Sequence, residues 1–167
     1  MTMDEVVRRA TSNDVSELSR LEALARDGLR EVRGGALRLQ ECPPVGDWTS
    51  VLVDPTRVVL VGSLDGAIVA YLVMLLSPSK NRLLISHVYV EVEGRELGLG
   101  DSMVEQAIAV ALDADLGGIE AVALPGDRET KNMFERAGLT ARKLTVYKSL
   151  RSSAGDSQRP SLVEPAD

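Results

Sequence analysis

An arginine and two closely spaced glycines stand between a strand-like run and a helix-like run of this sequence. They are Arg95, Gly98 and Gly100, in the stretch RELGLG. Glycine has no Cβ, so a ligand can approach its amide closely, and a helix N-terminus adds unpaired N–H groups and the positive end of its dipole. The arrangement predicts an anion-binding turn, although a glycine-rich turn between strand and helix also forms for geometric reasons alone.

Two familiar phosphate-binding patterns do not fit this turn. In the dinucleotide pattern Gly-x-Gly-x-x-Gly, the sixth position counted from Gly98 is Met103 rather than glycine. The P-loop requires Gly-Lys followed by Ser or Thr, and these residues do not follow here. The predicted anion site therefore belongs to neither class.

The composition is typical of a single domain with an aliphatic core. The chain has 167 residues, of which 44% are apolar and 26% charged, so it can bury roughly two-thirds of the surface of its unfolded chain. No window reaches the length of a membrane span, and the acidic start lacks the order of a signal peptide. We therefore expect a cytoplasmic protein with no membrane partner.

Charge and residue counts restrict the chemistry further. A net charge of −6 argues against a nucleic-acid partner and weakly favours a cationic small molecule. Cys42 is the only cysteine and His87 the only histidine, so we expect no disulfide and no metal site. The predicted chemistry is metal-free.

The elements that must position the turn follow from periodicity and turn residues. Strands are expected at 6–10, 57–63, 67–76, 82–92, 119–125 and 141–150, and helices at 11–32, 103–112 and 127–138. Asp65-Gly66 predicts a hairpin, and the apolar run 82–92 predicts a central strand. The order indicates an α/β domain over 1–150 with a mixed, mostly antiparallel central sheet flanked by helices. Residues 33–56 are expected to form a loop-rich arm, and residues 151–167 a disordered tail.

The stretch VYVEVEGRELGLGDSMVEQAI resembles the acyl-CoA signature of the GCN5-related N-acetyltransferase (GNAT) family. In that signature Arg or Gln, two residues, Gly, one residue, and Gly or Ala form the pyrophosphate loop, and Arg95, Gly98 and Gly100 match its fixed positions. The order of elements also resembles that of the family over roughly residues 5–150, and the downstream NMFERAGLTARKL strengthens the likeness. The resemblance implies an N-acetyltransferase that uses acetyl-CoA as co-substrate.

The resemblance also implies which residues hold the cofactor. The central strand would bind the pantetheine amides through main-chain groups of Val88, Tyr89 and Val90. The pyrophosphate would lie on the backbone of the turn, with Arg95 adding charge and the Asp101 side chain pointing to solvent. The turn residues implied to contact it are Glu96, Leu97, Gly98, Leu99, Gly100 and Asp101.

The acid and base of the reaction are less clear from the sequence. Many family members carry a tyrosine as the acid where this chain has Phe134, and Tyr147 is the remaining phenol that could replace it. The usual base positions hold Leu84 and Ser86. His87 has a suitable pKa, but strand alternation would turn it to the opposite face unless a bulge intervenes. Cys42 is interpreted as an incidental thiol, and proton transfer through water stays open.

The sequence thus predicts transfer of an acetyl group from acetyl-CoA to a primary amine by direct attack in a ternary complex. Small-molecule and peptide amines are both open as acceptors, and a homodimer is compatible with the family. The alternative is a non-catalytic acyl-CoA-binding or sensing domain, because the usual tyrosine and a carboxylate base are both missing.

Overall fold

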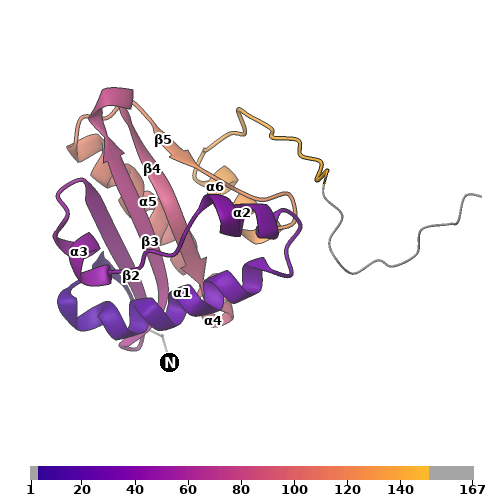
Figure 1. Cartoon of the computed structure of the whole chain (residues 1–167). Coiled ribbons are helices and arrows are strands. Elements are labelled where there is room, and N and C mark those ends of the chain that lie inside the picture. The colour runs from indigo at the N-terminus through magenta and orange to yellow at the C-terminus, as the bar shows by residue number, and fades with distance from the viewer. Residues whose placement is uncertain (1–3, 151–167) are drawn as a thin grey trace, which may run out of the picture.

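The computed structural model describes residues 4–150 and contains one five-stranded sheet with helices on both faces (Figure 1). The strands, in the spatial order of their numbering, are β1 (Glu5–Arg9), β2 (Arg57–Leu64), β3 (Ala67–Ser77), β4 (Arg82–Val90) and β5 (Ile119–Ala121). Neighbours are antiparallel except β4 and β5, which are parallel. The predicted α/β fold with a mixed, mostly antiparallel sheet is confirmed.

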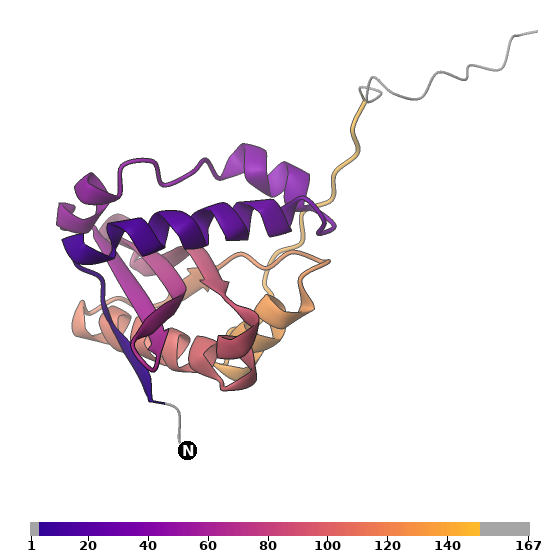
Figure 2. The ribbon, with the colours of Figure 1, turned by 90° about the horizontal axis from the view of Figure 1, so that it is seen from below.

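The helices form two layers, which are seen from below in Figure 2. One layer contains α1 (Val15–Leu29), α2 (Gly35–Glu41) and α3 (Trp48–Val53); the other contains α4 (Val92–Glu96), α5 (Leu99–Asp113) and α6 (Arg128–Arg136). We call the two sides of the sheet the α1 face and the α5 face. None of the helices that the structure describes is long and apolar enough to cross a membrane.

Each face of the sheet has its own apolar core. On the α1 face, Leu18 and Leu21 of α1 pack with Trp48 and Tyr71, and the two aromatic rings meet edge to face with centroids 5.7 Å apart. Trp48 is only 3% exposed, so it anchors the arm that was expected between residues 33 and 56. On the α5 face, the sheet packs against Leu99, Met103, Val104 and Ala107 of α5.

The hairpin between β2 and β3 turns at Asp65-Gly66, as predicted. Both residues have positive φ, +47° for Asp65 and +85° for Gly66. Two consecutive positive φ values are required by the tight turn that suits the twist of paired strands, and Asp-Gly adopts them readily.

A bulge in β4 decides which face His87 occupies. The register with β3 shifts between Val73 and Met74, because Val73 pairs with His87 while Met74 pairs with Ile85. The extra residue is Ser86, and it places His87 with Val73 on the α1 face. The prediction from simple alternation, that His87 faces away from Leu84, is therefore wrong.

Parallel pairing between β4 and β5 covers only the first part of β4. Leu83, Leu84 and Ile85 pair with residues 119–121, after which the two chain segments separate. The strand predicted over 119–125 is therefore shorter than expected, because its later residues leave the sheet towards α6. Residues 87–90 pair with β3 on one side, and no strand within residues 4–150 pairs with them on the other.

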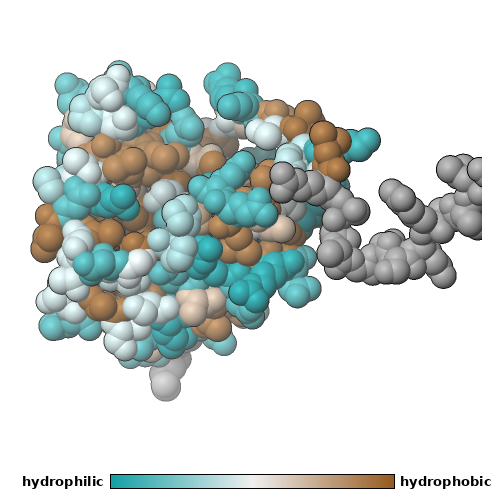
Figure 3. Space-filling view, viewed as in Figure 1, coloured by the Kyte–Doolittle hydropathy of each residue, from teal (hydrophilic) through white to brown (hydrophobic). Residues whose placement is uncertain are grey.

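The strand predicted at 141–150 is not formed. An isolated strand has neither hydrogen-bond partners nor a surface that covers one of its faces, and β5, at the edge of the sheet, is only three residues long. Leu144, Val146 and Leu150 are consequently 79%, 86% and 89% exposed. Figure 3 shows hydrophobic side chains over this segment, which projects from the body of the domain. The tail predicted at 151–167 lies outside the described residues.

Candidate active site

The turn before α5 is shaped by Gly98. This residue is the N-cap of α5 and has φ = +82°, a conformation that glycine adopts without strain. A Cβ placed on Gly98 would meet no heavy atom within 4 Å, so its outer side is open. Leu99 and Gly100 occupy the first positions of the helix, where backbone N–H groups lack intrahelical partners. Both residues are buried, so the turn has backbone donors without helical partners and a positive dipole end, which are the features of an anion site, beneath the open Gly98.

Gly100 has a different role from Gly98. It is buried, and a Cβ at this position would lie 2.7 Å from Sδ of Met133 on α6 and 3.5 Å from Val90. The missing side chain lets α5 pack closely against α6. The two glycines of the predicted motif thus separate into one that leaves space outside the turn and one that permits packing beneath it.

Arg95 links the turn to both β4 and α6. Its Nε donates to the Val90 carbonyl at 2.6 Å, and its guanidinium forms an ion pair with Glu129. The guanidinium carbon also lies 5.8 Å from the centroid of the Tyr89 ring, within the range of a cation–π contact. The arginine side chain is 39% exposed, so it adds positive charge beside the turn while holding the end of β4.

The acidic residue of the turn has its own cation. Both carboxylate oxygens of Asp101 accept hydrogen bonds from Arg136 of α6, at 2.8 to 3.1 Å. This side chain, expected to point to solvent, is 36% exposed and forms the ion pair at the surface, which offsets its charge beside a predicted phosphate site. Other backbone groups of the turn are bound within it. The Asp101 amide donates to the Gly98 carbonyl, and the Leu97 amide donates to the Arg95 carbonyl.

Glu96 is the last residue of α4, and its side chain is exposed.

The uncovered edge of β4 runs away from the turn. Backbone groups of alternate residues point to the same side of a strand. The Glu91 amide donates to the Val69 carbonyl of β3, so the backbone of Tyr89 also faces β3. The Val90 carbonyl is bound by Arg95, and the backbone of Val88 points with it to the uncovered edge. Of the three residues predicted to bind pantetheine, Val88 and Val90 therefore present their main chain there.

A pocket lies at the far end of this edge, where β4 and the segment after β5 separate. We call it the His87 pocket; the side chains used below that line it are Arg26, Arg38, Cys42, Tyr71, His87 and Phe134. Arg38 donates to the Ser86 carbonyl at 2.7 Å, which fastens α2 over the bulge of β4. The α2 layer, the bulge and the separated strands therefore enclose one site.

His87 forms hydrogen bonds through both ring nitrogens. Nδ1 lies 3.0 Å from the Ser86 hydroxyl, and Nε2 lies 3.3 Å from Sγ of Cys42. Burial lowers the pKa of His87 below its usual range, while the Pro43 carbonyl and the Glu22 carboxylate act in the opposite direction by favouring the charged ring. His87 is consequently neutral at pH 7 and can accept a proton.

The pairing of Cys42 with His87 was missed from the sequence, where Cys42 is interpreted as an incidental thiol. The two residues are 45 positions apart, and no local pattern joins the end of α2 to the middle of β4. The sequence does contain one usable signal, because each is the only residue of its type in the chain.

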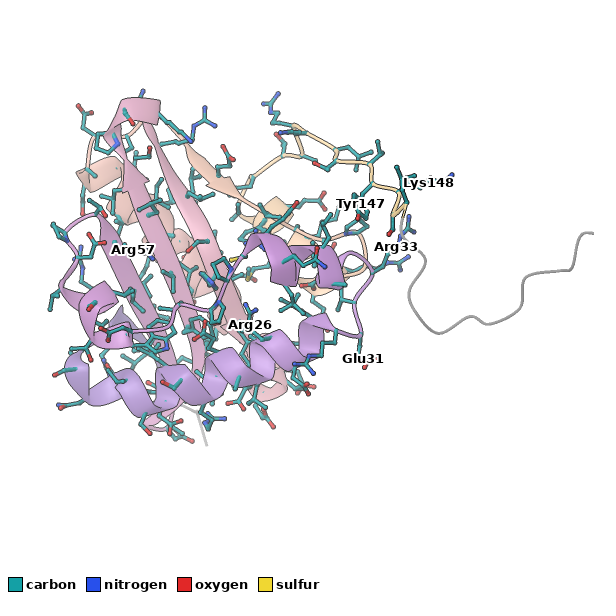
Figure 4. All side chains as sticks on the ribbon, in the orientation of Figure 1. Arg26, Glu31, Arg33, Arg57, Tyr147 and Lys148 are labelled. Atoms are coloured by element: carbon teal, nitrogen blue, oxygen red, sulfur yellow. The ribbon has the colours of Figure 1, made fainter. Side chains whose placement is uncertain are left out.

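The two phenols differ sharply in position. Tyr71 of β3 is 2% exposed and lines the His87 pocket, and burial raises its pKa. Tyr147, predicted as the acid, is 68% exposed and does not line the pocket. Figure 4 shows Tyr147 beside Arg33 and away from Arg26. The structure thus brings His87 and Tyr71 together and leaves Tyr147 outside, because the strand that was to carry it is not formed.

Phe134 lines the same pocket from α6 and is 5% exposed. Its ring lies where the resemblance places a phenol, and it closes the pocket with apolar surface only. Asp127 accepts a hydrogen bond from the Thr130 amide at 3.1 Å and so serves as the N-cap of α6.

The comparisons with known proteins agree with this architecture. The profile described as the Acetyltransferase (GNAT) family matches residues 21–139, which is more than half of the chain. The chain therefore belongs to the GNAT family, and it is an acyltransferase. A search of curated proteins finds no match.

Solved structures of low sequence identity share the fold. A tetramutant of the BH1408 protein from Bacillus halodurans has a TM-score of 0.70 at 21% identity, covering 87% of this chain and 99% of its own. The aminoglycoside 6'-N-acetyltransferase AAC(6')-Ih from Acinetobacter baumannii has a TM-score of 0.65 at 14% identity, with 90% and 100% covered. A predicted acetyltransferase from Clostridium acetobutylicum, solved with acetyl-CoA, has a TM-score of 0.63 at 14% identity, with 88% and 97% covered.

Proposed function

We propose that this protein transfers the acetyl group of acetyl-CoA to a primary amine, on a small molecule or a peptide, by direct attack in a ternary complex. One observation carries the proposal. The Gly98 turn, the uncovered edge of β4 and the His87 pocket follow one another along a single strand. A long cofactor with an anion in its middle and a reactive thioester at one end suits such a path.

The turn and the strand edge would hold the cofactor. The pyrophosphate would bind at the start of α5, where the amides of Leu99 and Gly100 have no intrahelical partner, with Arg95 adding charge. Main-chain groups of Val88 and Val90 would bind the pantetheine amides, with Arg95 already occupying the Val90 carbonyl. When bound, acetyl-CoA supplies an activated acyl group as a thioester.

His87 is the residue we propose as base. An alkyl amine with a pKa near ~10.4 is mostly protonated at neutral pH and must lose a proton before it attacks. Because burial keeps His87 neutral, its ring can take that proton directly or through water. Tyr71 is the phenol that could return a proton to the departing thiolate, and it replaces Tyr147 in this role because it lines the pocket.

The charges around the pocket restrict the acceptor. Of the carboxylates near it, Asp127 accepts from the Thr130 amide and Glu22 from the Val45 amide. Arg26 donates to the Cys42 carbonyl and Arg38 to the Ser86 carbonyl, so their partners are neutral oxygens. Neither arginine forms an ion pair with a carboxylate within the described part of the chain, residues 4–150. We propose that the acceptor carries an anionic group beside its amine, in contrast to the cationic molecule suggested by the net charge.

Thiol release from acetyl-CoA across a panel of amines tests this function. The panel contains polyamines, aminoglycosides, amino acids and peptide N-termini, and a His87→Gln variant serves as control. We expect release that depends on an added amine, is greatest for acceptors with a carboxylate, and falls in the variant. Tight binding of acetyl-CoA with no amine-dependent release would contradict the proposal and favour a sensing domain.

A further inference from the structure

Cys42 is held at the wall of the His87 pocket by both of its backbone groups. Its amide donates to the Arg38 carbonyl at 2.8 Å, and its carbonyl accepts from Arg26 at 2.9 Å. Sγ itself lies 3.3 Å from Nε2 of His87 and 3.9 Å from the Ser86 carbonyl. A thiol so placed lies where an acceptor amine would have to approach the proposed base.

The hydrogen bonds of Ser86 favour one tautomer of His87, in which the nitrogen beside the Cys42 thiol is an acceptor. The Ser86 hydroxyl donates its single hydrogen to the Val73 carbonyl at 3.2 Å, so towards His87 it can only accept. In the tautomer that satisfies both Ser86 bonds, Nδ1 carries the ring hydrogen of neutral His87 and Nε2 presents its lone pair to Sγ of Cys42. This is the arrangement in which an imidazole removes the proton of a thiol.

We propose that Cys42 is itself an acetyl acceptor, a modification site that receives the acetyl group of acetyl-CoA bound to the same molecule when no amine occupies the pocket. The inference rests on the proposed function, because the thioester must reach the pocket along β4. It adds a second acceptor chemistry, a thiol, to the amine chemistry proposed above.

The step balances without any further reactant. His87 Nε2 removes the proton from Cys42, and the thiolate attacks the carbonyl carbon of the acetyl thioester. The new bond from Sγ to carbon forms, the bond from carbon to the CoA sulfur breaks, and the imidazolium returns its proton to the CoA thiolate. The reactants and the products each contain one thioester and one thiol, so the exchange is nearly thermoneutral. Excess CoA therefore drives the reverse reaction. Transfer to an amine instead yields an amide, which favours the amine whenever one is bound.

Intact-protein mass spectrometry tests the proposal on the full chain incubated with acetyl-CoA and no amine. We expect one added acetyl group that hydroxylamine removes and that excess CoA reverses. Because the chain has a single cysteine, a hydroxylamine-labile thioester identifies Cys42. The group should be absent from Cys42→Ala, and it should form about a hundredfold more slowly in His87→Gln, as loss of a general base predicts.

Calorimetry with CoA distinguishes the ways in which the experiment can fail. If the protein binds CoA but gains no acetyl group, or gains one that resists hydroxylamine or persists in Cys42→Ala, the proposal is overturned. Amine-dependent thiol release is measured separately, so it can survive that result. Conversely, Cys42 can be acetylated while every amine in the panel fails, which would overturn the proposed acceptor and leave this inference standing.

Discussion

The Gly98 turn lies beyond the C-terminal end of β4 and the His87 pocket lies at the bulge of that strand, and the two sites are formed by different parts of the chain. The turn consists of backbone: a positive φ at Gly98 and the first amides of α5. The pocket consists of side chains from separate elements, with Cys42 after α2, Tyr71 on β3 and His87 on β4. A backbone site is encoded locally, whereas a side-chain site exists only after the chain has folded.

This difference predicts that changes at the two sites have separable consequences. Loss of a side chain in the pocket should lower turnover and leave cofactor affinity intact. Loss of space at the turn should lower cofactor affinity. A change that moved both quantities equally at both sites would show that the two regions are not distinct.

The largest effect is expected at His87. His87→Gln removes the proposed base while keeping a polar side chain, so kcat should fall by about a hundredfold or more. The affinity for acetyl-CoA, measured by calorimetry, should stay within about twofold, a difference of about 0.4 kcal/mol. Turnover close to that of the unmodified protein would remove His87 from the mechanism and leave water as the proton acceptor.

Matched substitutions of Tyr71 and Tyr147 test which phenol is the general acid. Tyr71→Phe keeps the ring that packs on Trp48 and removes only the buried hydroxyl, so kcat should fall by about tenfold or more if that group protonates the thiolate. Tyr147→Phe should leave kcat unchanged, because that side chain is 68% exposed and outside the pocket. The reverse ranking in steady-state assays would restore Tyr147 as the acid. Equal activity of both variants would assign the proton to water.

At the turn, Gly98→Val should weaken CoA binding by about tenfold, or about 1.4 kcal/mol. Gly66→Val is its control, because Gly66 has nearly the same φ, +85° against +82°, and is equally open. Both variants should lose similar stability in thermal melts, since both force a branched residue into the left-handed region. If calorimetry shows the same loss of affinity in both, strain rather than blocked access explains the effect.

The smallest expected effect is a shift in pH dependence. Because burial lowers the pKa of His87, kcat/KM should decline on acidification with an apparent pKa below about 6.5. The unfolded chain binds this proton more readily, so the free energy of unfolding should also fall as the pH drops below about 6.5. His87→Gln should lose both dependences. An acidic limb that is unchanged in the variant would have to come from another group.

Much of the fold and of the turn could be predicted from sequence because the signals are local. Asp65-Gly66 specified its hairpin, and the strand, bare turn and helix around Gly98 followed from residue types in order. The packing role of Gly100 was not predicted, because its neighbour Met133 belongs to α6, which begins 28 positions later, at Arg128. Local patterns do not reveal such packing.

The pocket could not be predicted for a related reason. A bulge adds one residue to β4, and this inverts the face of His87 without any signature in the sequence. The contact between Cys42 and His87 joins positions that only the packing of α2 over β4 brings together. The segment 141–150 alternates like a strand, but alternation does not supply a partner strand.

A crystal structure with a non-hydrolysable acetyl-CoA analogue tests the central claim most directly. We predict the pyrophosphate on the amides of Leu99 and Gly100, the pantetheine along the uncovered edge of β4, and the acetyl end in the pocket beside Cys42 and His87. An analogue bound elsewhere, or bound at the turn with its acetyl end directed away from His87, would contradict the account.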